Sequence, residues 1–290
     1  MLASAILPET PRKAVRRFDY VGAVTLVFAV LGVLFALNRG PEWGWTSPVV
    51  LAAFAVTPLG IALFLWAERR AEDPLLPLHY LRRRNFSLPI GASAFGNFAY
   101  MGGFYLAPAL LQHPRLFGYG ESRTGLMVLV RPLTFSLIAP MSGYLAVRFG
   151  ERIAAVVGIF AVTCSMAVFT TVDGASTDLL ILLALGLSGL GLGMAMPSIS
   201  ASVANSVEQT DLGIASASQQ LVVQVATVAG VQLMTTVQAT LAPEGLASSF
   251  QRAYLLGGVV SLLGVACAFG IRRAQRERVE GAPEGALETA

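Results

Sequence analysis

Charged residues are scarce in this sequence, since Asp, Glu, Lys and Arg make up only 13% of its 290 residues. An average soluble domain carries about 25% charged residues, which cover its water-facing surface. A soluble fold of this length would therefore lack polar surface. The shortage of charge excludes an ordinary soluble domain.

Residue types that bind metals or perform catalysis are equally few. The two cysteines, Cys164 and Cys267, fall inside apolar runs, and the two histidines, His79 and His113, stand alone in predicted loops. The sequence contains no H-E-x-x-H pattern, no Cys-His cluster and no pair of carboxylates within an apolar run. It therefore predicts no metal, no cofactor and no enzyme activity, with an intramembrane enzyme as the weakest alternative.

Apolar residues make up 55% of the chain and occur in long runs. A run of about 20 residues is long enough for a helix to cross about 30 Å of hydrocarbon. The runs predict spans at 20–38, 48–67, 88–111, 124–147, 153–172, 178–199, 213–237 and 252–271. Short loops with Gly and Pro separate them, so neighbouring spans should be antiparallel. We predict an all-α, polytopic membrane helical bundle of about eight transmembrane helices.

The basic residues lie in short clusters between the apolar runs, although the net charge is +3. This placement argues against a nucleic-acid partner and indicates membrane topology, because Lys and Arg are retained in the cytoplasm during insertion. Fifteen Lys and Arg residues fall on the side of the N-terminal segment and four on the other side. We therefore expect a multi-pass protein of the plasma or inner membrane with both termini in the cytoplasm.

Arg131 is the clearest ionisable residue within a predicted span, and Pro132 follows it directly. A charge at the centre of a membrane helix costs about 2.5 to 3.5 kcal/mol on insertion scales, so it is rarely kept without a use. One interpretation is a cation that faces the transport cavity and serves substrate binding or coupling. The other is a side chain that reaches toward the outer interface or pairs with a neighbouring helix.

Two further spans carry polar side chains on one face. At 100° per residue, Gln220 and Gln224 share a stripe of the seventh span, and Asn97 and Tyr100 form a cluster on the third span. Such faces should not point at lipid. They either line a hydrated path or form hydrogen bonds with other helices.

Glycine follows a helical spacing in the sixth span. Gly186, Gly189 and Gly193 share one side, and Pro197 lies one turn beyond them. A smooth face of this kind is typical of close helix packing or of helices that move against each other. No strand precedes the glycines, so they do not indicate a nucleotide-binding loop.

Four stretches together resemble the EmrB/QacA-type fourteen-span drug:proton antiporters of the major facilitator superfamily, in the second half of those proteins. The stretches are Phe18-Asp19-x-x-Gly22; Gly44-Trp45-x-Ser47; Glu68-Arg69-Arg70 followed by Pro74-Leu75 and Arg84-x-Phe86; and Gly143-x-Leu145-Ala146-x-Arg148-x-Gly150-x-Arg152. The last is similar to the loop signature of the superfamily. It has Val147 where the family usually carries an acidic residue that helps to lock the closed state.

The resemblance implies a C-terminal portion of such a transporter. Its expected parts are a cytoplasmic segment at 1–17, a linker helix pair at 18–85, a six-helix transporter bundle at 86–272 and a disordered cytoplasmic tail at 273–290. The N-terminal six-helix bundle of the family is absent from the sequence. Gly143, Arg148, Gly150 and Arg152 would then take part in conformational change.

The expected function is transmembrane transport, namely efflux of amphipathic drugs or other organic compounds in exchange for protons. Alternating access resembles the rocking of one bundle against another around a site near the midplane, so a missing N-terminal half is an expected partner. The expected cavity residues are Arg131, Asn97, Tyr100, Gln220 and Gln224. The alternative function is a membrane half-bundle that does not transport and acts as a partner or regulatory subunit.

Overall fold

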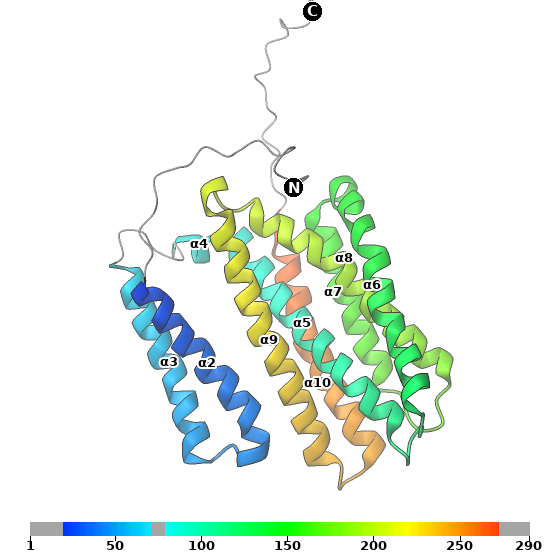
Figure 1. Cartoon of the computed structure of the whole chain (residues 1–290). Coiled ribbons are helices and arrows are strands. Elements are labelled where there is room, and N and C mark those ends of the chain that lie inside the picture. The colour runs from blue at the N-terminus through cyan, green and yellow to red at the C-terminus, as the bar shows by residue number, and fades with distance from the viewer. Residues whose placement is uncertain (1–19, 71–78, 273–290) are drawn as a thin grey trace, which may run out of the picture. The chain divides into compact units, whose positions relative to one another are not determined.

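The computed structural model describes residues 20–70 and 79–272. The predicted N-terminal segment at 1–17 and the predicted tail at 273–290 lie outside the described residues. All the regular structure in the described part of the chain is helical (Figure 1). The chain divides into two compact units, Met1–Leu78 and His79–Ala290, which are described separately below.

The first unit contains the helices α2 (Tyr20–Trp43) and α3 (Pro48–Glu68). Gly44 turns the chain between them with φ +84°, a conformation that favours glycine. A Cβ added at Gly32 or at Gly60 would meet a backbone atom of the other helix at 2.9 or 2.8 Å. The two helices therefore pack as a close antiparallel pair.

Residues 79–272, the described part of the second unit, form six long helices and two short ones. The long helices are α5 (Arg84–Gln112), α6 (Glu121–Phe149), α7 (Glu151–Phe169), α8 (Asp178–Ala204), α9 (Leu212–Leu241) and α10 (Leu246–Phe269), and the short ones are α4 (His79–Arg82) and η1 (Gln209–Asp211).

Seven of the described helices are long and apolar enough to cross a membrane. They are α2, α3, α6, α7, α8, α9 and α10, the span of α9 beginning in η1. The remaining long helix, α5, lies where the third span was expected but is less apolar, because it carries Gly, Ser, Asn and Tyr along its length. It is also largely buried inside the bundle and needs less apolar surface. The predicted fold class, a membrane helical bundle, is confirmed.

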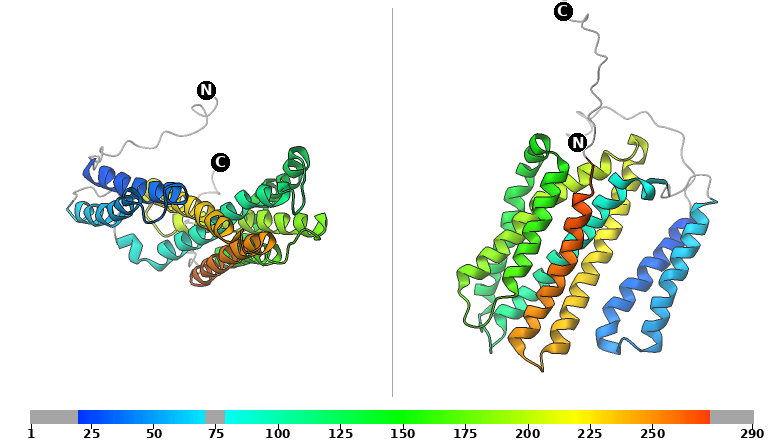
Figure 2. Two further views of the ribbon diagram at one scale, coloured as in Figure 1. Left: turned by 90° about the horizontal axis from the view of Figure 1, so that it is seen from below. Right: turned by 180° about the vertical axis from the view of Figure 1, so that it is seen from behind.

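In the second unit, α8 packs between α6 and α7, while α9 and α10 lie side by side (Figures 1 and 2). The helix α5 contacts both groups, since it packs on α9, α10 and α8. Its buried residues Phe98, Leu106 and Leu110 belong to the main apolar core, together with Met166 of α7 and Tyr254 of α10. This arrangement makes α5 the centre of the bundle.

The predicted domain boundary between residues 85 and 86 stays a prediction. The division into compact units falls between Leu78 and His79. The short helix α4 accounts for the difference, because it packs on α5 and so belongs to the second unit.

Candidate functional site

Arg131 lies on α6 at the point where α6 meets α8. Its relative exposure is 0%, and it is the largest fully buried side chain in the described part of the chain. A Cβ added at Gly189 of α8 would overlap the Arg131 carbonyl oxygen and the Thr134 hydroxyl. The absence of a side chain at Gly189 therefore allows α8 to hold the backbone of α6 at Arg131.

The Arg131 guanidinium reaches across to α5. Its Nη2 donates a hydrogen bond of 2.5 Å to the carbonyl oxygen of Tyr100. The guanidinium carbon, Cζ, lies 3.8 Å from the centre of the Tyr100 ring and 5.5 Å from the centre of the Phe104 ring. Its Nε and Nη1 have no hydrogen-bond partner among the described residues. The guanidinium is thus held on a buried aromatic face with two of its donor atoms unused.

The six long helices of this unit contain no Asp or Glu between their end turns. The acidic residues Glu121, Glu151 and Asp178 each begin a helix, and Asp211 caps the start of α9. Glu121 is ten residues before Arg131 on the same helix, which corresponds to about 15 Å. The helix interiors therefore supply no counter-charge for Arg131.

Tyr254 of α10 also packs on α5, one turn from the Tyr100 carbonyl oxygen that Arg131 binds. Its hydroxyl donates to the Gly103 carbonyl oxygen at 3.3 Å, and its ring stacks on Phe169 with 4.4 Å between ring centres. A Cβ added at Gly103 would meet the Met166 side chain at 2.9 Å. These buried contacts support the segment of α5 that carries Tyr100 and Phe104.

The other predicted cavity residues fall into two groups. Asn97 is buried on α5, where its Nδ2 donates to the Ser93 carbonyl oxygen at 2.8 Å and lies 3.4 Å from Met196 Sδ of α8. Gln220 and Gln224 are exposed along α9. The structure thus brings Arg131 together with Tyr100, and it leaves the two glutamines on an open face.

Gln219, which is not among the predicted cavity residues, is buried and donates to the Ser200 hydroxyl at 3.2 Å. It lies on the buried side of α9 with Ala215 and Val223, four residues before and after it. That spacing of four residues was the available signal.

The predicted packing glycines of α8 face α6. A Cβ at Gly193 would meet the Phe135 carbonyl oxygen at 2.7 Å, whereas one at Gly186 would make an ordinary contact with Val130 at 3.7 Å. Pro197 lies within α8 one turn beyond Gly193. The closest approach of the two helices is therefore at Gly189 and Gly193.

The residues of the loop signature lie around the junction of α6 and α7. Gly150 is the N-cap of α7, with φ +92°. Arg148 is exposed, and the Arg152 guanidinium lies 5.9 Å from the Phe269 ring of α10. A Cβ added at Gly143 would meet no described atom within 4 Å. Their role in conformational change stays a prediction.

A polar cluster around the buried Tyr80, which no sequence pattern predicted, joins α4 to the connection between α8 and α9. Tyr80 is 1% exposed, and its hydroxyl donates to Asp211 Oδ2 at 2.8 Å. Arg83 donates to the Ser206 carbonyl oxygen at 3.0 Å and stacks over the Tyr80 ring at 4.7 Å. Burial, and then the hydrogen bond to Asp211, raise the pKa of the Tyr80 hydroxyl above its usual value.

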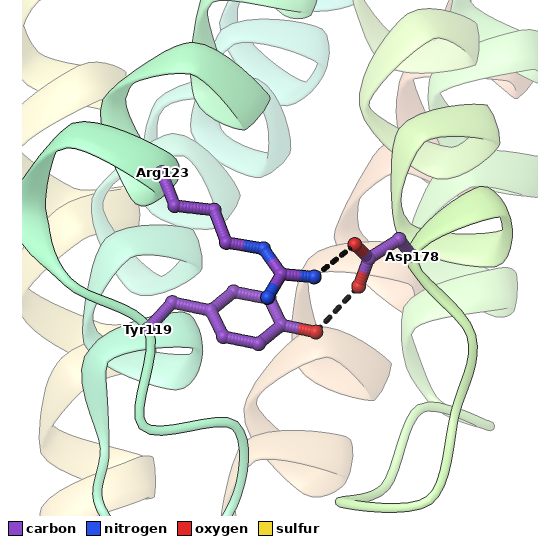
Figure 3. A network of polar contacts seen from close by, with 3 residues as sticks. All are labelled: Tyr119, Arg123 and Asp178. Atoms are coloured by element: carbon purple, nitrogen blue, oxygen red, sulfur yellow. Dashed lines mark hydrogen bonds and ion pairs between the residues drawn. The ribbon is translucent and has the colours of Figure 1, made fainter.

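A second cluster lies at the opposite end of the bundle (Figure 3). Tyr119 and Arg123 both donate to the carboxylate of Asp178, and the Arg123 guanidinium lies 3.7 Å from the centre of the Tyr119 ring. The hydrogen bond to Asp178 raises the pKa of Tyr119. The cluster joins the start of α6 to the start of α8, and the two side chains of its ion pair are 55% and 39% exposed.

No group of three or more His, Cys, Asp or Glu side chains in residues 20–70 and 79–272 could hold a metal ion. The chemistry that the described site offers is therefore hydrogen bonding and charge.

The chain is similar in sequence to a known protein family and to several known proteins. Residues 10–231 and 93–289 match the sequence profile of the Major Facilitator Superfamily. The chain is 29% identical over 215 residues to the multidrug resistance protein Stp of Mycobacterium tuberculosis, covering 74% of this chain and 40% of Stp. It is 24% identical over 204 residues to the multidrug transporter protein MdtP of Bacillus subtilis, covering 70% of this chain and 37% of MdtP. It is 29% identical over 236 residues to a tetracycline resistance determinant of Streptomyces rimosus, covering 77% and 65% respectively.

Proposed function

The chain belongs to the Major Facilitator Superfamily, and we propose that it forms part of a transporter that exports amphipathic organic compounds from the cell in exchange for protons. The names of the relatives, which describe multidrug resistance, multidrug transport and tetracycline resistance, support export over any enzyme activity. Both termini would lie in the cytoplasm, as the distribution of Lys and Arg indicates.

The observation that carries this proposal is the exposed polar face of α9. This helix is long and apolar enough to cross a membrane, yet Ser216, Gln220 and Gln224 are exposed along one side of it. Side-chain amides and hydroxyls that face hydrocarbon lose their hydrogen bonds to water, which is unfavourable. This face would therefore line a hydrated path rather than contact lipid.

A hydrated path needs a second wall. The chain spans 40% and 37% of the lengths of Stp and MdtP. Transporters with alternating access move one helical bundle against another around a site near the midplane. We therefore propose a second helical bundle as the partner of the polar face, with the bilayer around both.

The alternative function is a half-bundle that stabilises or regulates another membrane protein without transporting anything. This alternative predicts the same insertion in the membrane and the same partner surface, but no substrate-driven movement of protons. Only a flux measurement separates the two functions.

Substrate-driven proton movement in proteoliposomes tests the proposal. The chain would be reconstituted alone and together with a six-helix bundle of the same superfamily produced from a second gene. We expect substrate-dependent proton movement with both bundles and none without substrate. Stable insertion without proton movement in either preparation would favour the partner subunit over the transporter.

A further inference from the structure

Arg131 is the buried charge that the fold leaves least satisfied. Its Nε and Nη1 have no hydrogen-bond partner among the described residues, although the side chain is fully buried. A buried donor without a partner is destabilising, and a charged donor more so. We expect the described fold to be at least as stable with an apolar residue at this position, so the two free donor atoms need another explanation.

The orientation of the guanidinium indicates what kind of group it could bind. One of its faces stacks on the Tyr100 ring at 3.8 Å, and Nη2 is engaged with the Tyr100 carbonyl oxygen. Free N–H groups in the plane of a guanidinium bind planar anionic oxygens best, because the donors form a rigid fork that matches them. A cationic group would be repelled at the same place.

A resident carboxylate cannot fill this role within the described bundle. The helices α5 to α10 carry acidic residues only in their end turns or caps, with Glu121 about 15 Å away along α6. The neutral rings of Tyr100 and Phe104 surround the guanidinium instead. A compensating negative charge must therefore enter from outside these helices.

Phe104 lies beside Arg131 and is partly exposed at the surface of the unit. Of the two rings that the guanidinium contacts, Tyr100 is 7% exposed and Phe104 is 37% exposed. Phe104 thus borders the surface of the unit while lying 5.5 Å from the guanidinium carbon. The exposed Phe104 ring would offer an apolar surface to an aromatic ligand that approaches Arg131.

We propose that Arg131 binds an anionic oxygen of the transported compound, a carboxylate or an enolate, while Tyr100 and Phe104 contact its aromatic or apolar part. The transporter would then select acidic amphipathic compounds over cationic ones. This assignment rests on the proposed function in naming the substrate class of that site.

Equilibrium dialysis of the chain in lipid nanodiscs tests the assignment without any transport. The probes are three anthracenes of similar size that differ in charge: 9-anthracenecarboxylate, 9-anthracenemethanol and 9-anthracenylmethyl-trimethylammonium, with empty nanodiscs as the baseline. We expect the carboxylate to bind about 10- to 100-fold more tightly than the alcohol, as one or two charge-assisted hydrogen bonds would give. The trimethylammonium compound should bind most weakly.

Variants locate the preference at Arg131. Arg131→Gln should bring the ratio of carboxylate to alcohol affinity close to one, while Arg115→Gln, which changes an exposed loop arginine, should keep the native ratio. Arg131→Lys keeps a positive charge without the planar fork and should lower the ratio of carboxylate to alcohol affinity while keeping it above one, so it serves if Arg131→Gln does not fold; an unchanged ratio in Arg131→Lys would overturn the assignment.

Equal affinities for the three probes, or tighter binding of the cation, would overturn the assignment and leave the proposed export function standing. A charge preference that persists in Arg131→Gln would also overturn it. A failed proton flux together with a clear preference for the carboxylate would instead refute only the transport function.

Discussion

Two buried polar side chains of the bundle, Tyr80 and Arg131, differ in how many of their hydrogen-bond donors have partners. At one end, Tyr80 donates to Asp211 and Arg83 donates to the Ser206 carbonyl oxygen, so the cluster ties α4 to the α8–α9 connection. Within the bundle, Arg131 makes one hydrogen bond and leaves Nε and Nη1 without partners in the described residues. Satisfied polar groups stabilise a fold, whereas unsatisfied ones are usually retained for function. The cluster around Tyr80 is thus structural, and Arg131 with Tyr100 is the candidate site.

The largest effect is expected at the glycine contact that positions Arg131. Gly189→Ala would force a Cβ into the backbone of α6 at Arg131, where it would overlap the Arg131 carbonyl oxygen. We expect a loss of about 3 kcal/mol or more in stability, or no folded protein. Gly186→Ala on the same helix, with its nearest atom at 3.7 Å, is the matched control and should unfold near the native temperature. Equal effects of the two changes would show that α6 and α8 do not approach as described.

The second largest loss of stability is expected at the cluster around Tyr80. Tyr80→Phe keeps the ring and removes the hydroxyl that donates to Asp211. We expect a loss of about 1 to 3 kcal/mol, the cost of leaving a buried polar group with one partner fewer. Thermal unfolding in detergent measures it, and an unchanged unfolding temperature would show that this cluster does not stabilise the bundle.

The same hydroxyl predicts a dependence on pH. Because burial and Asp211 raise the pKa of Tyr80 in the folded chain, the folded state holds this proton more tightly than the unfolded state does. Its contribution to stability should be complete below pH 10, the ordinary pKa of tyrosine, and should fall as the pH rises above it. Unfolding temperatures from pH 9 to pH 11 should decline less steeply in Tyr80→Phe than in the native chain. Parallel curves would contradict this.

Substitution of Arg131, unlike that of Tyr80, should not lower the stability of the bundle. Arg131→Met replaces a buried, partly unsatisfied charge by an apolar side chain that is also long and flexible. Its stability should be unchanged or up to about 2 kcal/mol higher, because the desolvation cost of the charge is removed. A clear loss of stability in Arg131→Met, comparable to that of Tyr80→Phe, would make Arg131 a structural residue as well.

The smallest effect is expected at the exposed cluster of Tyr119, Arg123 and Asp178 (Figure 3). Exposed ion pairs contribute little, because water and salt screen them. Tyr119→Phe should lower the unfolding temperature by about 1 °C, an amount close to the error of the measurement. A decrease as large as that of Tyr80→Phe would mean that the cluster is shielded from solvent in the membrane.

The helices could be predicted from sequence because each long apolar run has only one way to satisfy its backbone in a membrane. Side-chain orientation was harder. Gln220 and Gln224 are both exposed on α9, whereas the adjacent Gln219 is buried, since a rotation of 100° separates neighbours on a helix. Intramembrane charge singled out Arg131, whereas its contact with Tyr100 depends on how α5 and α6 pack.

The cluster around Tyr80 could not have been predicted from local sequence. Tyr80 and Asp211 are 131 residues apart, and no periodic pattern relates them. The short helix α4 also lies in a stretch without an apolar run, where helical periodicity gives no signal. Contacts of this kind arise only when the bundle brings distant ends of helices together.

The most direct test of the central claim, that Arg131 is retained for transport rather than for folding, is a transport measurement in proteoliposomes with both bundles present. Native protein, Arg131→Gln and Arg115→Gln would be compared at equal amounts of inserted protein. We predict that Arg131→Gln loses substrate-driven proton movement while Arg115→Gln retains it. Native rates in Arg131→Gln would contradict the account.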